Sequence, residues 1–228
     1  MCDHLMQFIP RHAATIGRDR IETVVRRGIA KAADAGFDTA GPVRLYLDMI
    51  CLFGSDFATD PQFPWAGEIL NAGSTVDQAA RADALYRRSL RFLDAVFGPD
   101  NRHGMLALGA LADWTRGAEA LPADGFDAAA ADKLEAIWPH RHAHVGAGPL
   151  RLLAAKARAQ AAVHGLATPR GQTLVFALMV GFGHGFAEDP LYPWFAEDMR
   201  RDLVTDPAGR LEARMQAYLS VVMRRARG

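Results

Sequence analysis

The chain has 228 residues, of which half are apolar and 23% are charged, the usual balance for a globular protein. Lysine plus arginine equals aspartate plus glutamate at 26 each, so the chain lacks the basic excess typical of nucleic-acid-binding proteins. Cys2 and Cys51 show no metal-type spacing, the N-terminus has no secretory leader pattern, and no apolar run reaches the length of a membrane span. We therefore expect a cytoplasmic protein with no membrane insertion and no nucleic-acid partner.

Helical patterns fill the first part of the chain. Two short helices are predicted around Pro10, the second of which stops at Gly17, and an amphipathic helix follows over 19–35. Residues 43–53 are apolar on nearly every side, which predicts a buried central helix. After a turn-rich segment, the periodicity predicts a long helix over 77–97.

The following stretch, 99–131, combines a turn, a predicted helix over 104–117 and a loop at 121–125. This pattern fits either a connector or a lid between two helical regions. Beyond it, 172–182 is again apolar on nearly every side, and 208–226 has the periodicity of a long helix. Because no alternating pattern typical of strands occurs, the predicted fold class is all-α.

The sequence contains an internal repeat with an offset of 129 residues. This shift aligns 3–70 with 132–199 without a gap and gives 20 identities in 68 positions. The strongest match joins 53–65 (FGSDFATDPQFPW) to 182–194 (FGHGFAEDPLYPW), with eight identities in 13 positions. We call these two segments the first and the second corner. Self-similarity of this kind indicates duplication of a multi-helix unit.

The repeat predicts the domain organisation. We expect a first helical repeat over 1–98, a connector or lid over 99–131, and a second helical repeat over 132–228. The two repeats are expected to form one compact domain of pseudo-symmetric halves, packed through the two apolar central helices.

Each shared position of the corners has a structural explanation. Gly54 and Gly183 follow an apolar helix, where a left-handed C-terminal cap favours glycine. Asp followed by Pro is a turn signal, and a second proline suits the first position of a new helix. Each tryptophan would anchor that new helix on the core. The residues assigned to this structural role are Gly54, Pro61, Trp65, Gly183, Pro190 and Trp194.

The alternative is a catalytic role for the corners. Asp60 and Asp189 would then act as paired carboxylates of a hydrolase, with Asp56 as a third acid and His184 as a titrating group. An active site requires these four side chains to converge on one cleft. Two distant aspartates, each bonded only to backbone, would contradict it. The turn interpretation is favoured because Asp before Pro is so common in turns.

Candidate binding residues lie near the corners. Arg44 and Asp48 are four residues apart on one face of a very apolar helix, so we expect them to pair with each other or to line a cleft. Phe63 and Tyr192 precede the second proline of each corner and supply aromatic surface. These four residues form the predicted binding set.

The sequence predicts no metal site and no cofactor. His140, His142 and His144 resemble a metal cluster, but on a helix His142 points away from the other two. The chain has no HExxH motif or CxxC pair, no phosphate-binding loop and no convincing dinucleotide turn.

The segment RRGIAKA at 26–32, together with the first corner, resembles a group of uncharacterised bacterial all-α proteins encoded near type VI secretion and other toxin genes. The similarity covers most of the first repeat and the corner of the second. It implies an accessory role beside a secreted effector and carries over no catalytic residues. The leading hypothesis is a protein-binding module of the adaptor, chaperone or immunity type, with a toxin or secretion component as partner. A carboxylate hydrolase and a self-associating structural protein are the alternatives.

Overall fold

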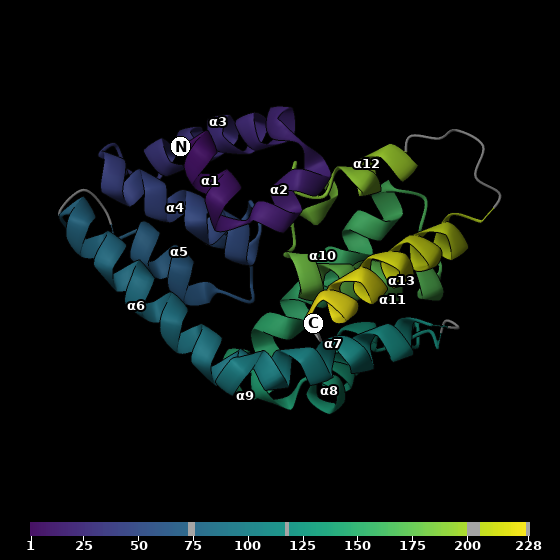
Figure 1. The fold of residues 1–228 in the computed structure, drawn as a ribbon. Helices are drawn as coiled ribbons and strands as arrows, with labels where there is room; N and C mark the ends of the chain where they lie inside the picture. The colour runs from purple at the N-terminus through teal and green to yellow at the C-terminus, as the bar shows by residue number, and fades with distance from the viewer. Residues whose placement is uncertain (73–75, 117–118, 200–205, 227–228) are drawn as a thin grey trace.

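The computed structural model describes residues 1–72, 76–116, 119–199 and 206–226. In these ranges it contains α-helices, three short 3₁₀ helices and no strand, and 79% of the structure is helical (Figure 1). The all-α prediction is confirmed. Within the same ranges, no helix is both long and apolar enough to cross a membrane.

The helices that precede residue 98 are α1 (Cys2–Phe8), α2 (Pro10–Ile16), α3 (Arg18–Asp34), α4 (Ala40–Phe53), η1 (Phe57–Thr59), α5 (Pro64–Leu70) and α6 (Gln78–Phe97). The middle of the chain forms η2 (Pro99–Asn101), α7 (Arg102–Thr115) and α8 (Phe126–Ile137). The remaining helices are α9 (Pro139–Val145), α10 (Ala147–Val163), α11 (Pro169–Phe182), η3 (Phe186–Glu188), α12 (Pro193–Met199) and α13 (Pro207–Ala226).

Local sequence explains most helix boundaries. Proline stands at the first position of α2, α5, α9, α11 and α12, where its missing N–H has no helical partner to lose. The carboxylate of Asp77 caps α6 by accepting hydrogen bonds from the backbone N–H groups of Ala79 and Ala80. The hydroxyl of Thr168 caps α11 by accepting from the N–H of Gly171. The starts of α6 and α11 therefore follow from caps that act within one turn.

The helix before Pro139 is longer than the repeat predicts. The alignment implies a short helix like α1, which has seven residues, whereas α8 has 12 residues. Four consecutive alanines over 128–131 favour helix strongly. Ala130 and Leu134 are fully buried, and α8 packs against α10. Propensity and packing therefore extend this helix beyond the end of the aligned segment.

The two apolar central helices are α4 and α11. Helix α4 packs against α3 and α6, while α11 packs against α10, α13 and α7. Their mutual contact lies at their C-terminal ends, where the first and second corners begin. The two helices therefore meet at their ends, and the packing of two halves through them stays a prediction. Each helix is enclosed by its own neighbours, which satisfies its apolar surface locally.

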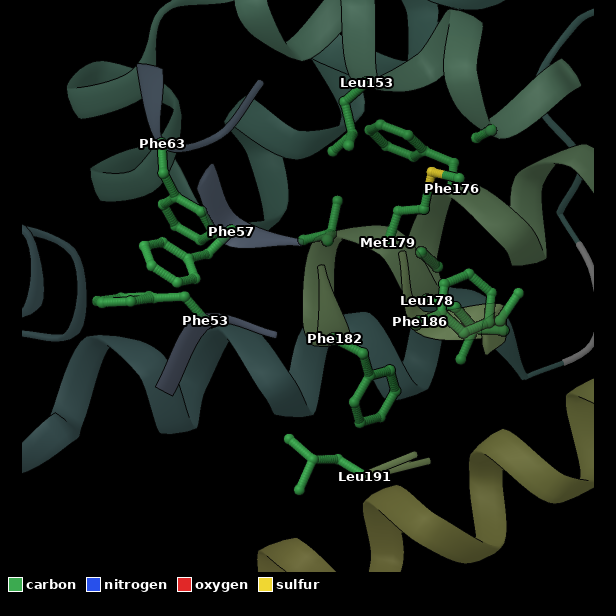
Figure 2. Close-up of a cluster of buried hydrophobic side chains, with 14 of the residues drawn as sticks. Phe53, Phe57, Phe63, Leu153, Phe176, Leu178, Met179, Phe182, Phe186 and Leu191 are labelled. Atoms are coloured by element: carbon green, nitrogen blue, oxygen red, sulfur yellow. The ribbon is translucent and has the colours of Figure 1, made fainter. Parts of the chain in front are cut away.

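Figure 1 shows the resulting arrangement, with α1–α6 in purple to blue on one side and α10–α13 in green to yellow on the other. Helices α7–α9 lie beneath both groups, and α7 packs against α6, α11 and α13. Figure 2 shows aromatic side chains of both corners, with Phe53 beside Phe63 in the first corner and Phe182 on α11 below Met179. Burial of each such ring stabilises the fold by about 1.5–3 kcal/mol. The corners thus lie where the two groups of helices meet.

Candidate functional site

The ends of α4 and α11 touch through two glycines. Gly54 (φ 94°, ψ 159°) and Gly183 (φ 88°, ψ 158°) have a backbone conformation that only glycine adopts readily. A Cβ atom on Gly54 would lie 2.6 Å from the carbonyl oxygen of Phe182, and one on Gly183 would lie 2.8 Å from that of Phe53. Two separate features therefore require glycine at each position: the backbone angles and the contact between the corners.

The aspartates of the Asp-Pro turns connect the two corners. The backbone N–H of His184 donates to Asp60 Oδ2 at 2.7 Å, and the N–H of Ser55 donates to Asp189 Oδ2 at 2.8 Å. The second oxygen of each aspartate accepts from its own turn, from the N–H of Gln62 or of Leu191, at 2.8 Å in both cases. Each carboxylate therefore holds its own turn and the opposite corner at once.

Both carboxylates are buried, Asp60 with 2% and Asp189 with 3% of its surface exposed. Burial raises the pKa of Asp189, while the backbone N–H groups of Leu191 and Ser55 oppose the rise. The side-chain amide of Gln62 adds a donor to Asp60 at 3.3 Å and also donates to the carbonyl of Met179 at 3.0 Å. Buried carboxylates whose oxygens are occupied by N–H donors fit a structural connection.

His184 lies beside this connection. Its Nδ1 is 4.0 Å from Asp60 Oδ2, and its Nε2 is 3.2 Å from the Thr59 hydroxyl. Burial lowers the pKa of His184, as do the nearby ammonium groups of Lys156 and Lys31, while Asp60 and Asp56 oppose this. The imidazole is therefore neutral at neutral pH, and its contact with Asp60 is not an ion pair.

Asp56 occupies the more open edge of the junction. Its carboxylate pairs with Lys31 Nζ at 2.5 Å, and the same ammonium donates to the carbonyl of Ser55 at 3.0 Å. A Cβ atom on Gly185 would lie 2.0 Å from Asp56 Oδ2, so a side chain at position 185 would displace this carboxylate. The groove at this edge has a volume of about 380 Å³ and is also lined by Asp189.

The structure thus brings Asp56, Asp60, Asp189 and His184 together, as an active site would require. It also bonds Asp60 and Asp189 to backbone, as the turn interpretation requires. These two buried carboxylates already accept hydrogen bonds on both oxygens, so neither is poised to take a proton from a substrate. Chemically, the described arrangement joins two helical groups better than it activates water.

The charged pair of α4 lies elsewhere. Asp48 Oδ1 is 2.5 Å from His4 Nε2, and Arg44 Nε is 3.3 Å from the same nitrogen. The two charged residues therefore meet through a histidine of α1, which the spacing along α4 did not indicate. The contact fastens α1 onto α4, and His4 also stacks on Phe8.

The two aromatic binding candidates pack within clusters. Phe63 is buried, and its ring centroid is 4.8 Å from that of Phe53. Tyr192 is half-buried, and its ring lies 4.7 Å from that of Phe182. Trp65 and Trp194 contact the same rings, Phe53 and Phe182 respectively, from the side at 5.9 Å and 6.2 Å. These rings anchor α5 and α12 at the junction.

The three histidines of α9 have separate neighbours. His140 stacks on His103 with ring centroids 3.6 Å apart, and His144 meets the edge of Phe92. His142 Nδ1 lies 3.9 Å from a Glu135 carboxylate oxygen. Among the described residues, no three His, Cys, Asp or Glu side chains come together as metal ligands would.

The sequence did not single out two arginines that are buried, Arg81 and Arg141. Arg81 donates to three backbone carbonyls, those of Ala35, Leu70 and Gly36, at 2.8–3.0 Å. Arg141, on α9, is 5% exposed and forms no hydrogen bond or ion pair with a described residue. Its guanidinium carbon lies 4.6 Å from the ring centre of Trp138. The available signal was the i, i+3 spacing of Trp138 and Arg141, which the neighbouring histidines obscured.

Burial lowers the pKa of Arg141 to about 10, and the charge of Asp60 opposes this. The guanidinium therefore stays protonated at neutral pH inside an apolar environment.

Comparisons of the chain with protein-family models, curated proteins and solved structures give no match.

Proposed function

We propose that this chain is a protein-binding module of the adaptor, chaperone or immunity type that acts in the cytoplasm. The observation that carries the proposal is the outer face of α10. Leu152 is 62% exposed and Val163 is 81% exposed, and the exposed Ala155 and Ala159 lie between them. With 3.6 residues per turn, these four positions fall on one side of the helix. We call them the α10 stripe.

The opposite face of α10 is buried against α8 and α11, so the helix is apolar on two sides and only one is covered. A helix that is apolar on most sides is usually enclosed by protein. Exposed apolar surface bordered by charges, here Arg151 and Lys156, is typical of protein contacts. A partner with an apolar patch and acidic neighbours would complement this face.

We further propose that the two helical repeats, 1–98 and 132–228, arose by duplication and form pseudo-symmetric halves. The similar backbone angles of Gly54 and Gly183 support this origin, as do the exchanged hydrogen bonds of Asp60 and Asp189. In this account the corners serve as the scaffold that presents α10. A carboxylate hydrolase is less well supported, because the two central carboxylates are already occupied by backbone donors.

The test uses the products of neighbouring toxin or secretion genes as partners. Each is co-expressed with the chain, and the affinity of any complex is measured by calorimetry. In the double variant Leu152→Asp with Val163→Asp we expect binding at least tenfold weaker. Charges would replace apolar groups at the contact, which costs about 2 kcal/mol or more of binding free energy.

The matched control is Leu106→Asp on α7, which changes an equally apolar residue that is 69% exposed on another helix. It should leave the affinity unchanged. Equal loss in the control and in the double variant contradicts a specific role for the α10 stripe. Light scattering on the chain alone covers self-association, since a dimer that the double variant dissociates would identify a second copy as the partner.

A further inference from the structure

A cavity of about 210 Å³ lies between the ends of α4 and α11 and the helices α6, α7 and α9. Its wall is largely aromatic, and three of its rings, Phe53, Phe63 and Phe182, are drawn in Figure 2. Leu52 and Gly181, which also line it, are exposed and mark its opening to solvent. The cavity is therefore a largely aromatic, accessible pocket at the junction of the two helical groups.

Arg141 is the one charged residue among the described residues that line this cavity. Only 5% of the surface of Arg141 is exposed, and its Nε atom has no hydrogen-bond partner. Trp138 and Phe92 contact the guanidinium through their ring faces, at 4.6 Å and 6.0 Å. Ring faces attract a cation but leave all five N–H donors unused.

The nearest acidic group does not complete the site. Asp60 influences Arg141 electrostatically, yet its two oxygens accept from the backbone of Gln62 and His184 and from the Gln62 amide. A buried cation whose donors are unpaired is costly, and proteins usually pair such groups. A guanidinium that faces an open cavity instead can take its partner from solution.

We infer that this cavity binds a small organic monoanion, a carboxylate on an aromatic or branched aliphatic body, through Arg141. The planar guanidinium fork matches a carboxylate with two parallel hydrogen bonds. One cation balances one negative charge, which favours a carboxylate over a phosphate dianion. A cavity of about 150 Å³ suffices for benzene, so this one holds a molecule of the size of benzoate. The inference is independent of partner binding by the α10 stripe, because neither α10 nor its exposed residues line the cavity.

The first test compares benzoate with benzamide on the unmodified protein, by calorimetry and by tryptophan fluorescence, to which Trp138 at the cavity wall contributes. The two probes have nearly the same shape and differ in charge. We expect saturable benzoate binding that is at least tenfold tighter than benzamide binding, since charge-assisted hydrogen bonds are about twice as strong as neutral ones. Inorganic sulfate tests the apolar body and should bind at least tenfold more weakly than benzoate.

The second test uses Arg141→Met, which keeps an apolar side chain of similar length and removes the charge. It should abolish the preference for benzoate over benzamide. Arg151→Met, at an exposed position of α10, is the matched control and should bind benzoate like the unmodified protein. If Arg141→Met does not fold, Leu108→Trp fills the cavity from α7 and leaves Arg141 in place, and it should remove benzoate binding.

Three results would overturn the inference. They are equal affinity for benzoate and benzamide, sulfate binding as tight as benzoate binding, and unchanged benzoate binding in Arg141→Met. Absence of benzoate, phenylacetate and 4-methylpentanoate binding to the unmodified protein would overturn it as well. The comparison on the unmodified protein decides the question even if both variants fail to fold.

Discussion

Replacing Gly54 by alanine tests the contact between the two corners. Alanine at this position must adopt φ 94° and ψ 159°, a region that is nearly exclusive to glycine and costs roughly 1–3 kcal/mol for other residues. Its Cβ would also lie 2.6 Å from the carbonyl oxygen of Phe182. That oxygen belongs to the backbone of the opposite corner and cannot move without displacing it.

A matched control separates the cost of the backbone conformation from the cost of the contact between the corners. Gly17 has φ 84° and ψ 163°, almost the same backbone angles, but a Cβ there meets nothing within 4 Å. Gly17→Ala should therefore lower the free energy of unfolding by the backbone term alone, roughly 1–3 kcal/mol. Gly54→Ala should cost about 1–3 kcal/mol more, the usual cost of inserting a methyl group into a filled site.

The assay is urea unfolding of both variants and the unmodified chain, followed by circular dichroism with the slopes compared to check two-state behaviour. The difference between the two variants reports the contact between the corners. Equal losses in Gly54→Ala and Gly17→Ala would refute the argument that the corners touch through their glycines. A larger loss in Gly17→Ala would do so even more clearly.

Two further predictions concern titration at the junction. Because the pKa of Asp189 is raised above its usual 3.8, the folded state binds this proton more readily, so stability should fall as pH rises through and just above 3.8. In Asp189→Asn that fall should disappear. At neutral pH the free energy of unfolding of this variant should be lower by about 1–3 kcal/mol, because an amide cannot accept both N–H bonds. A variant as stable as the unmodified chain would contradict the structural role. The pKa of His184 is lowered from 6.5, so the unfolded state binds this proton more readily and stability should decline as pH falls below 6.5. His184→Asn should reduce this decline, measured by urea unfolding at several pH values, and an unchanged profile would show that His144 and His164, whose pKa values are also lowered, account for it.

The sequence predicts the fold class and most helix boundaries because these depend on local features. Proline at N1, glycine after an apolar helix and the period of apolar residues act within one or two turns. The predicted helices 19–35 and 77–97 therefore correspond closely to α3 and α6. The corner segments were also identified as turns, from their glycines and their Asp-Pro pairs, and each turn is bonded by its own aspartate.

What the sequence could not predict depends on contacts between distant segments. Spacing along α4 suggested that Arg44 and Asp48 pair with each other or line a cleft, but it did not indicate that His4, 44 residues from Asp48, contacts both. Periodicity shows which face of a helix is buried but not which element covers it, so the end-to-end meeting of α4 and α11 was missed. Arg141 lines a cavity formed by five helices, so its spacing from Trp138 along the chain did not by itself indicate its burial.

The junction and the inferred ligand site share their walls. Phe53 and Gly54 from the first corner line the cavity together with Phe182 and Gly183 from the second. A carboxylate bound to Arg141 would therefore contact both helical groups, and ligand that binds only the folded state adds its binding energy to the stability of the junction. Gly54 and Gly183 let the corners approach each other, because a Cβ atom on either would meet the backbone of the opposite corner. Replacing either glycine should therefore disturb the cavity wall together with the contact between the corners.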